Sequence, residues 1–97
     1  MLSLMTFLSG KMPTAQARGR EDEFVLECKQ PVSDTDINSW LQEFLNRAGL
    51  RDLKKGTGQD LTFNLKDGQG KWYVLIVSND SDEPANKRIR VSFYKTN

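Results

Sequence analysis

The segment from Leu61 to Ser78, LTFNLKDGQGKWYVLIVS, constrains the fold of this chain more than any other. It reads as two β-strands joined by a tight turn, because an alternating stretch and an apolar stretch flank the glycine-bearing KDGQG. Val74 to Val77 lie in the longest unbroken apolar run of the chain. Such a run within a strand indicates cover on both faces of a sheet. We therefore expect this strand to be central.

Two more strands are predicted, one before and one after this hairpin. Residues 24–29 and residues 88–94 alternate in polarity, which is typical of strands with one face toward a core. The apolar positions that we expect to face that core are Phe24, Leu26, Cys28, Ile89, Val91 and Phe93.

A helix is predicted between Ser33 and Gly49. Ser33 suits the N-cap, acidic residues follow it in the first turn, and Gly49 suits the left-handed residue after the last turn. Apolar residues recur between them at helical spacing and form one wide stripe: Ile37, Trp40, Leu41, Phe44, Leu45 and Ala48. We expect this stripe to lie on the sheet.

These elements predict an α+β fold, a two-layer sandwich with one helix on a mainly antiparallel four-stranded sheet in the order β-α-β-β-β. Residues 24–97 would form a single domain, and residues 1–23, without apolar periodicity, a flexible or docked N-terminal extension. Residues 50–59 and 79–87 read as polar connectors. The core is expected to contain Phe63, Leu65, Val74, Ile76, Val91 and Phe93.

The composition excludes several kinds of chemistry. The chain has no histidine and one cysteine, which removes the usual nucleophilic triads, histidine-containing zinc sites and thiolate clusters. Asp80, Asp82 and Glu83 lack the pattern of a calcium loop. Cys28 is expected to be a small buried core residue, with a reactive thiol as the alternative. We expect no enzyme activity, no catalytic residue, no cofactor and no metal.

The N-terminal residues leave two locations open. The apolar run from Leu2 to Leu8 is too short to span a bilayer, which takes about 20 residues. No Lys or Arg precedes it, and we expect a cytoplasmic protein. A secreted protein is the alternative, with residues 1–17 as a signal peptide cut after Ala17.

The sequence favours a small protein-interaction module, such as an adaptor, inhibitor or accessory subunit, that binds a partner or itself through an open sheet face or an edge strand. If Ile89, Val91 and Phe93 face the helix, alternation sends their neighbours to the open face. On the adjacent strand we expect Trp72, Val74 and Ile76 on the helix side. The predicted binding residues are therefore Tyr73, Leu75, Arg88, Arg90 and Tyr94. A homodimer or the segment from Leu2 to Leu8 would cover them.

Single-stranded nucleic acid is the alternative ligand of that face. Basic residues cluster near the C-terminus without an acidic residue among them, and aromatic residues could stack with bases. The residues concerned are Lys87, Arg88, Arg90, Lys95, Trp72, Tyr73 and Tyr94. A net charge of +1 for the whole chain argues against a strong polyanion binder.

Overall fold

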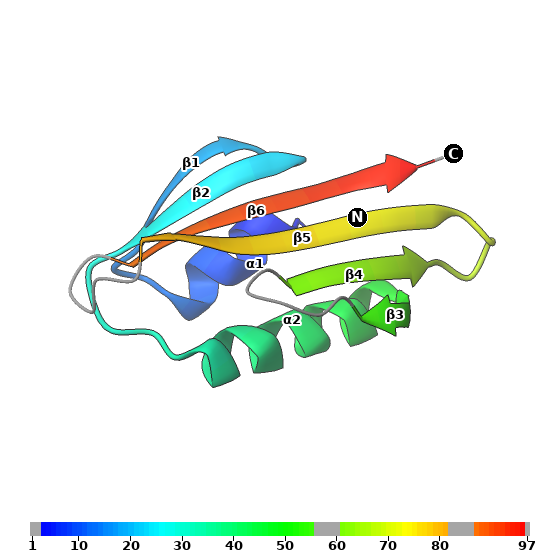
Figure 1. Ribbon diagram of the computed structural model, residues 1–97, viewed down its shortest axis with the longest axis horizontal. Coiled ribbons are helices and arrows are strands. Elements are labelled where there is room, and N and C mark those ends of the chain that lie inside the picture. Colours follow the sequence, from blue (N-terminus) through cyan, green and yellow to red (C-terminus); the bar gives the residue numbers. More distant parts are fainter. Residues whose placement is uncertain (1–2, 56–60, 82–86, 97) are drawn as a thin grey trace.

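A computed structural model describes residues 3–55, 61–81 and 87–96 (Figure 1). In these ranges the chain forms, in order, α1 (Leu4–Lys11), β1 (Gln16–Arg20), β2 (Glu23–Cys28), α2 (Asp34–Ala48), β3 (Arg51–Lys55), β4 (Leu61–Lys66), β5 (Trp72–Ser81) and β6 (Lys87–Thr96). The predicted connectors are partly strand, because β3 and the end of β5 fall within them; residues 56–60 and 82–86 lie outside the described residues.

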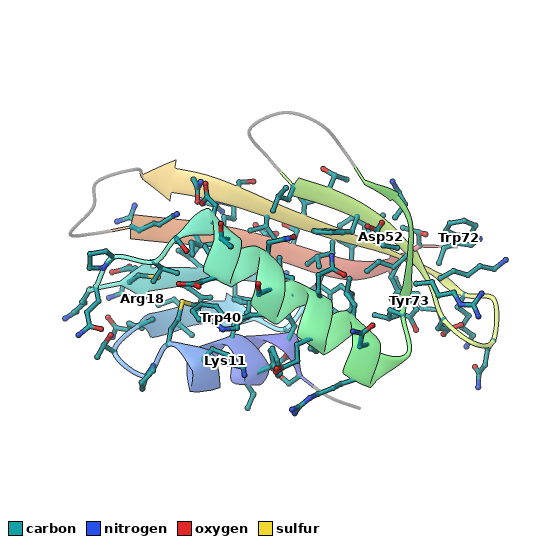
Figure 2. The ribbon with its side chains drawn as sticks, turned by 90° about the horizontal axis from the view of Figure 1, so that it is seen from below. Lys11, Arg18, Trp40, Asp52, Trp72 and Tyr73 are labelled. Atoms are coloured by element: carbon teal, nitrogen blue, oxygen red, sulfur yellow. The ribbon has the colours of Figure 1, made fainter. Side chains whose placement is uncertain are left out.

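The strands form one antiparallel sheet in the order β1-β2-β6-β5-β4-β3. Both described helices lie on the same face of it, which makes two layers (Figures 1 and 2). The α+β class, the β4–β5 hairpin and the central position of β5 are confirmed. The prediction of four strands and one helix is wrong, because the chain also forms α1, β1 and β3.

The ends of α2 follow the sequence signals. The Ser33 hydroxyl accepts a hydrogen bond from the Asp36 N–H at 3.1 Å, which satisfies one free donor of the first turn. Gly49 has a left-handed backbone with φ of 70°, and the Leu50 N–H after it donates to the Leu45 carbonyl at 2.9 Å. The predicted helix boundaries are therefore confirmed.

The N-terminal segment forms α1 and contributes to the core. Leu4, Leu8 and Met12 follow one another at four-residue spacing, and all three are buried. An ion pair of 3.0 Å between Lys11 and Glu43 links α1 to α2. The sequence of the segment shows no apolar periodicity because Met5 and Phe7, which stand between the buried leucines, are apolar as well.

The core lies between the sheet and the helices, and one strand faces it differently from the prediction. Leu75 and Val77 are buried, whereas Val74 and Ile76 are half-buried on the other face. Register is the reason: Leu75 pairs with Phe63 on β4 and with Phe93 on β6, and paired residues share a face. The predicted inward positions of β2, β4 and β6 are confirmed, and those of β5 are wrong.

Candidate interaction surface

The sheet face opposite the helices, which we call the open face, has an apolar centre. Trp72, Val74 and Ile76 on β5 and Tyr94 on β6 share this face, since Val74 pairs with Tyr94 in the ladder. Trp72 is 40% exposed and Tyr94 is 44% exposed. No described helix lies over this face of the sheet (Figure 1). The apolar run of β5 is thus covered on one face only.

Charged side chains surround this centre, and the basic ones outnumber the acidic ones. The register places on the open face the exposed or half-buried residues Arg18, Arg20, Lys66, Arg88 and Arg90, and with them Glu23 and Glu27. Arg18 pairs with Glu27 at 3.7 Å, and Arg90 pairs with Glu23 at 3.6 Å. The open face is therefore basic, with acidic groups interspersed along β2.

Trp72 stands where the apolar centre meets the basic border. Its indole projects outward near the end of the sheet (Figure 2), and the Lys66 ammonium lies 5.4 Å from the ring centroid. A cation over an aromatic face is attracted by the ring quadrupole. This contact orients both side chains toward solvent on the same face. An exposed aromatic residue beside a cation is a common anchor in protein interfaces.

The structure divides the predicted binding residues between the two faces. Arg88, Arg90 and Tyr94 lie together on the open face. The placement of Tyr73 and Leu75 there is wrong: Leu75 is fully buried under the helices, and Tyr73 stacks on Phe93 on that same side. The reason is that Tyr73, Leu75 and Val77 of β5 face the helices, whereas the prediction placed Trp72, Val74 and Ile76 there.

Sequence reasoning placed Trp72, Val74 and Ile76 on the helix side, which is the wrong face, and it did not find Arg18 of the open face. The loop between β4 and β5 determines which face the three β5 residues occupy. Residues 67–71 form this loop, which pairs Lys66 with Trp72 and thereby fixes the faces of β5 relative to β4. Arg18 belongs to β1, whose five residues are all exposed and give no alternating pattern. Nothing in the sequence marked that strand.

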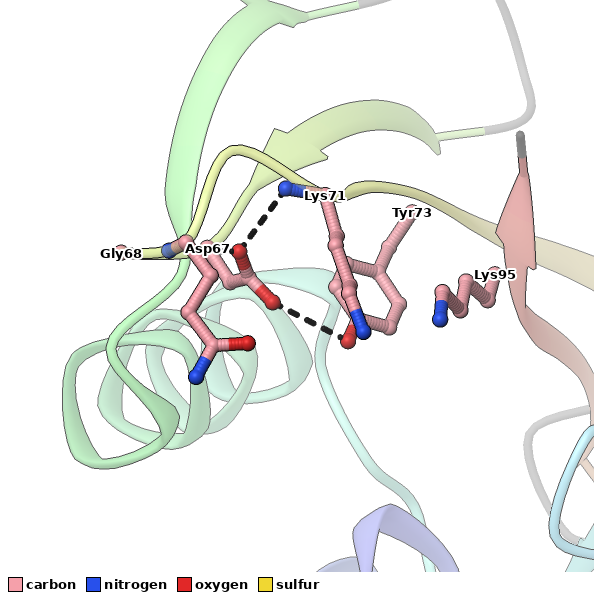
Figure 3. Close-up of a pocket in the computed structure, with 6 residues that line it drawn as sticks. Asp67, Gly68, Lys71, Tyr73 and Lys95 are labelled. Atoms are coloured by element: carbon pink, nitrogen blue, oxygen red, sulfur yellow. Dashed lines mark hydrogen bonds between the residues drawn. The ribbon is translucent and has the colours of Figure 1, made fainter.

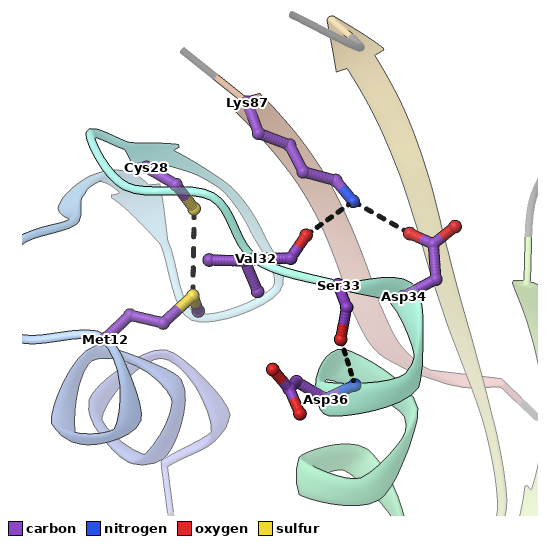
Figure 4. A network of polar contacts seen from close by, with 7 residues as sticks. All are labelled: Met12, Cys28, Val32, Ser33, Asp34, Asp36 and Lys87. Atoms are coloured by element: carbon purple, nitrogen blue, oxygen red, sulfur yellow. Dashed lines mark hydrogen bonds and ion pairs between the residues drawn. The ribbon is translucent and has the colours of Figure 1, made fainter. Parts of the chain in front are cut away.

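Two basic residues of the predicted nucleic-acid set lie on the helix side instead. Lys87 is engaged in the fold, because its ammonium donates to the Val32 carbonyl at 3.1 Å and pairs with Asp34 at 2.8 Å (Figure 4). The hydrogen bond from Lys87 lowers the pKa of the Asp34 carboxyl, and the charge of Lys87 adds to the effect. Lys95 follows Tyr94 and so faces the opposite side. The predicted cluster does not form one surface.

Cys28 is a core residue, as the sequence indicated. Its side chain is buried, and its sulfur lies 3.7 Å from the Met12 sulfur (Figure 4). Burial raises the pKa of the thiol, an effect that the charge of Lys87 partly opposes. Since the thiolate is the reactive form, burial disfavours reaction of this thiol.

Within the described residues, no three acidic, cysteine or histidine side chains come together as a metal site. Neither α1 nor α2 has the length and apolarity that a bilayer crossing requires. No family model, curated protein or solved structure matches this chain.

Proposed function

We propose that this protein is a small non-catalytic interaction module, an adaptor, inhibitor or accessory subunit, that binds an acidic surface of another protein through the open face. The observation that carries the proposal is the apolar centre on the two central strands, in which Trp72 and Tyr94 are exposed and Val74 and Ile76 are half-buried. Exposed apolar patches of this kind usually mark a contact surface.

The charges around the centre support a partner other than a second copy. If the open faces of two copies packed directly against each other, their basic residues would lie close together, and this repulsion disfavours a homodimer. An acidic partner would instead complement Arg88 and the excess of basic residues around the centre while its apolar residues cover Val74 and Ile76. A homodimer is one of the outcomes that the experiment distinguishes.

A photo-activated cross-linking residue at Tyr94 tests the proposal directly in cells. We expect a covalent adduct with an acidic protein, and no such adduct when the cross-linker replaces Gln42, an exposed residue on α2. The adduct should disappear when Ile76→Glu is added, because this charge disrupts the apolar centre. An adduct of twice the mass of the chain would indicate a homodimer. Equal adducts from Tyr94 and Gln42 would refute the assignment of the face.

Single-stranded nucleic acid is the second candidate, and the combination of Arg88 and Arg90 with Trp72 and Tyr94 on one face favours it. The acidic residues Glu23 and Glu27 weigh against a phosphate backbone, since both stand among the arginines. A labelled oligonucleotide separates the two candidates. Binding that falls steeply with added salt and that Trp72→Ala abolishes would favour nucleic acid.

The proposal includes a cytoplasmic location and no catalysis. A buried free thiol such as Cys28 remains reduced in the cytoplasm. Leu4, Leu8 and Met12, which a cut after Ala17 would remove, belong to the core. Fractionation of cells that express the full chain with a C-terminal tag would test the location: recovery of processed protein outside the cytoplasm would contradict it.

A further inference from the structure

β6 extends beyond its neighbour β2, so that part of β6 has a described strand on one side only (Figure 1). β2 pairs with residues 87–92 of β6, whereas β5 pairs with β6 as far as Thr96. Just past the last β2 pair, the Phe93 N–H donates to the Asp22 carbonyl at 2.9 Å. We call the stretch of β6 from Tyr94 to Thr96 the free end of β6.

The backbone of Lys95 points toward this unpaired side. In an antiparallel ladder the N–H and C=O of one residue point to the same neighbouring strand, and successive residues alternate between the two neighbours. The Phe93 N–H points to the β2 side, because it donates to Asp22, so the N–H and C=O of Lys95 point there too. No described strand lies on that side of Lys95. Its two backbone groups can therefore pair with an added strand.

A hollow of about 540 Å3 borders the free end of β6. Phe93 and Lys95 line it from the helix side and Tyr94 lines it from the open face, so the hollow continues around the strand edge from one face to the other. The Lys95 side chain extends toward Tyr73 on β5, away from this edge (Figure 3). The space in line with β2 is thus accessible to a second chain.

The neighbouring part of β5 is held in place by contacts with the core and with the loop of residues 67–71. The rings of Tyr73 and Phe93 stack with centroids 5.9 Å apart, and Phe93 meets the buried Phe44 edge-on at 5.8 Å. The Tyr73 hydroxyl donates to Asp67 at 3.2 Å, and Asp67 also accepts from the Lys71 N–H at 2.9 Å (Figure 3). A preformed edge of this kind loses little conformational freedom when a strand is added.

The edge strands β1 and β3 are less suited to accept another strand. Gly19 interrupts β1 with φ of 125°, and the exposed Arg18 and Arg20 flank it. β3 has a register shift between Asp52 and Lys54. Charged side chains and backbone irregularities on an edge oppose further pairing. The free end of β6, by contrast, pairs with β5 without a register shift.

We propose that the partner of the open face inserts an extended segment beside the free end of β6, in line with β2 and antiparallel to β6. The inference rests on the proposed function for the identity of this partner. The residue opposite Lys95 exchanges two backbone hydrogen bonds with it, and the next residue, opposite Tyr94, is apolar and packs on the Tyr94 ring. Because Tyr94 belongs both to the apolar centre and to the free end, one partner covers the two surfaces continuously.

The strand peptide acetyl-TVTVTVT-amide is the probe that tests this edge. Titration into the isotope-labelled full chain, followed by NMR, should move the Lys95 amide proton downfield to saturation, because this proton enters a hydrogen bond. When the valines lie beside Tyr94, the threonine amides point toward Lys95. A peptide N-methylated at its threonines should therefore bind at least about tenfold more weakly. The peptide N-methylated at its valines is the matched control and should bind as the unmethylated peptide does.

A backbone substitution tests the same hydrogen bond from the side of the protein. Lys95→Pro removes the N–H that points away from β5, so the ladder with β5 remains complete. This variant should keep a cooperative thermal transition and bind the peptide at least about tenfold more weakly. Lys95→Ala removes the charge and keeps the N–H, and it should bind as the parent does.

Three results would each overturn the pairing: no shift of the Lys95 amide at millimolar peptide, equal affinity of the two methylated peptides, or shifts confined to β1. The methylated peptides decide the question even if Lys95→Pro does not fold. Cross-linking from Tyr94 separates this inference from the proposed function. An adduct that Lys95→Pro leaves unchanged would keep the open face as the binding surface and refute strand pairing by the partner. Loss of all adducts in the parent would refute the proposed function alone, since the peptide tests the edge without the partner.

Discussion

Leu75 and Ile76 are neighbours in the chain and similar in size and hydrophobicity, yet the fold uses them in opposite ways. Leu75 is fully buried between the sheet and the helices, and Ile76 is half-buried on the open face. Strand geometry causes the difference, because successive side chains point to opposite faces. A substitution at each position therefore reports on a different face.

We predict that Leu75→Glu abolishes cooperative folding and that Ile76→Glu does not. The first places a carboxylate among apolar side chains, a cost comparable with the total stability of a small domain, about 5–15 kcal/mol. The second leaves the carboxylate in contact with water and should cost about 1 kcal/mol. Urea unfolding followed by circular dichroism measures both. Similar unfolding curves for the two variants would contradict the assigned register.

Phe44 anchors α2 to the rest of the core. Its ring is 1% exposed and contacts Phe7 at 5.7 Å and Phe93 at 5.8 Å between centroids. We predict that Phe44→Ala lowers the free energy of unfolding by about 3–5 kcal/mol through lost contacts and the cavity that remains. Gln42→Ala, at an exposed position of the same helix, should change it by about 0.5 kcal/mol or less. An unaffected melting temperature for Phe44→Ala would show that the ring is not in the core.

Asp34 makes stability depend on pH at the start of α2. Because its pKa is lowered in the folded state, its contribution is present above the pKa of the unfolded chain and is lost as the pH falls through the folded value. We predict that the parent is more stable than Asp34→Asn at pH 7 and that the difference disappears in acid. Thermal unfolding across this pH range measures it. A constant difference would show that the Lys87 contact contributes no charge interaction.

At the scale of elements, α1 is an integral part of the fold rather than an appendage. Its buried Leu4 and Leu8 belong to the same core cluster as the residues of α2 and the central strands. We predict that Leu8→Ala lowers the free energy of unfolding by about 2–5 kcal/mol. Thr6→Ala, on the exposed side of α1, serves as the control.

The elements that sequence reasoning found are those with a strong periodic pattern. The stripe and caps of α2 and the alternation of β2, β4 and β6 predict these elements correctly, because each has one buried and one exposed face. In β1 all five residues are exposed, and β3 contains a register shift between Asp52 and Lys54, so neither strand shows alternation.

The candidate site was harder to predict, because it depends on β5. Val74, Leu75, Ile76 and Val77 are all apolar, so their sequence does not say which pair faces the core. Only pairing with β4 and β6 decides it. The arginines and Tyr94 of β6 were placed on the correct face because that strand alternates clearly. The residues of β5 were assigned to the wrong faces because that strand has no alternation of polar and apolar residues.

At the scale of the whole molecule, the sheet that the described residues form has two edge strands, β1 and β3. Among these strands, β6 pairs on both sides, with β2 and with β5, whereas β1 pairs with β2 alone. The central strands also contain fully buried residues, Leu75 on β5 and Ile89 and Val91 on β6. Opening β1 exposes little apolar surface, because each of its residues is already exposed. The two strands should therefore differ in local stability.

We predict that native-state hydrogen exchange orders the strands from the centre outward. Amides of Ile89, Val91 and Phe93 on β6 should exchange only through global unfolding, since releasing them breaks the ladders on both sides and exposes the core. The bonded amides of β1 should exchange at least about tenfold faster through local opening, without loss of the core. Exchange measured by NMR at several low urea concentrations distinguishes the two routes, because global opening accelerates strongly with urea and local opening hardly does. Protection of β1 as strong as that of β6, with the same urea dependence, would contradict this prediction. It would show that β1 is covered in solution, by a partner or by a second copy that pairs with this strand.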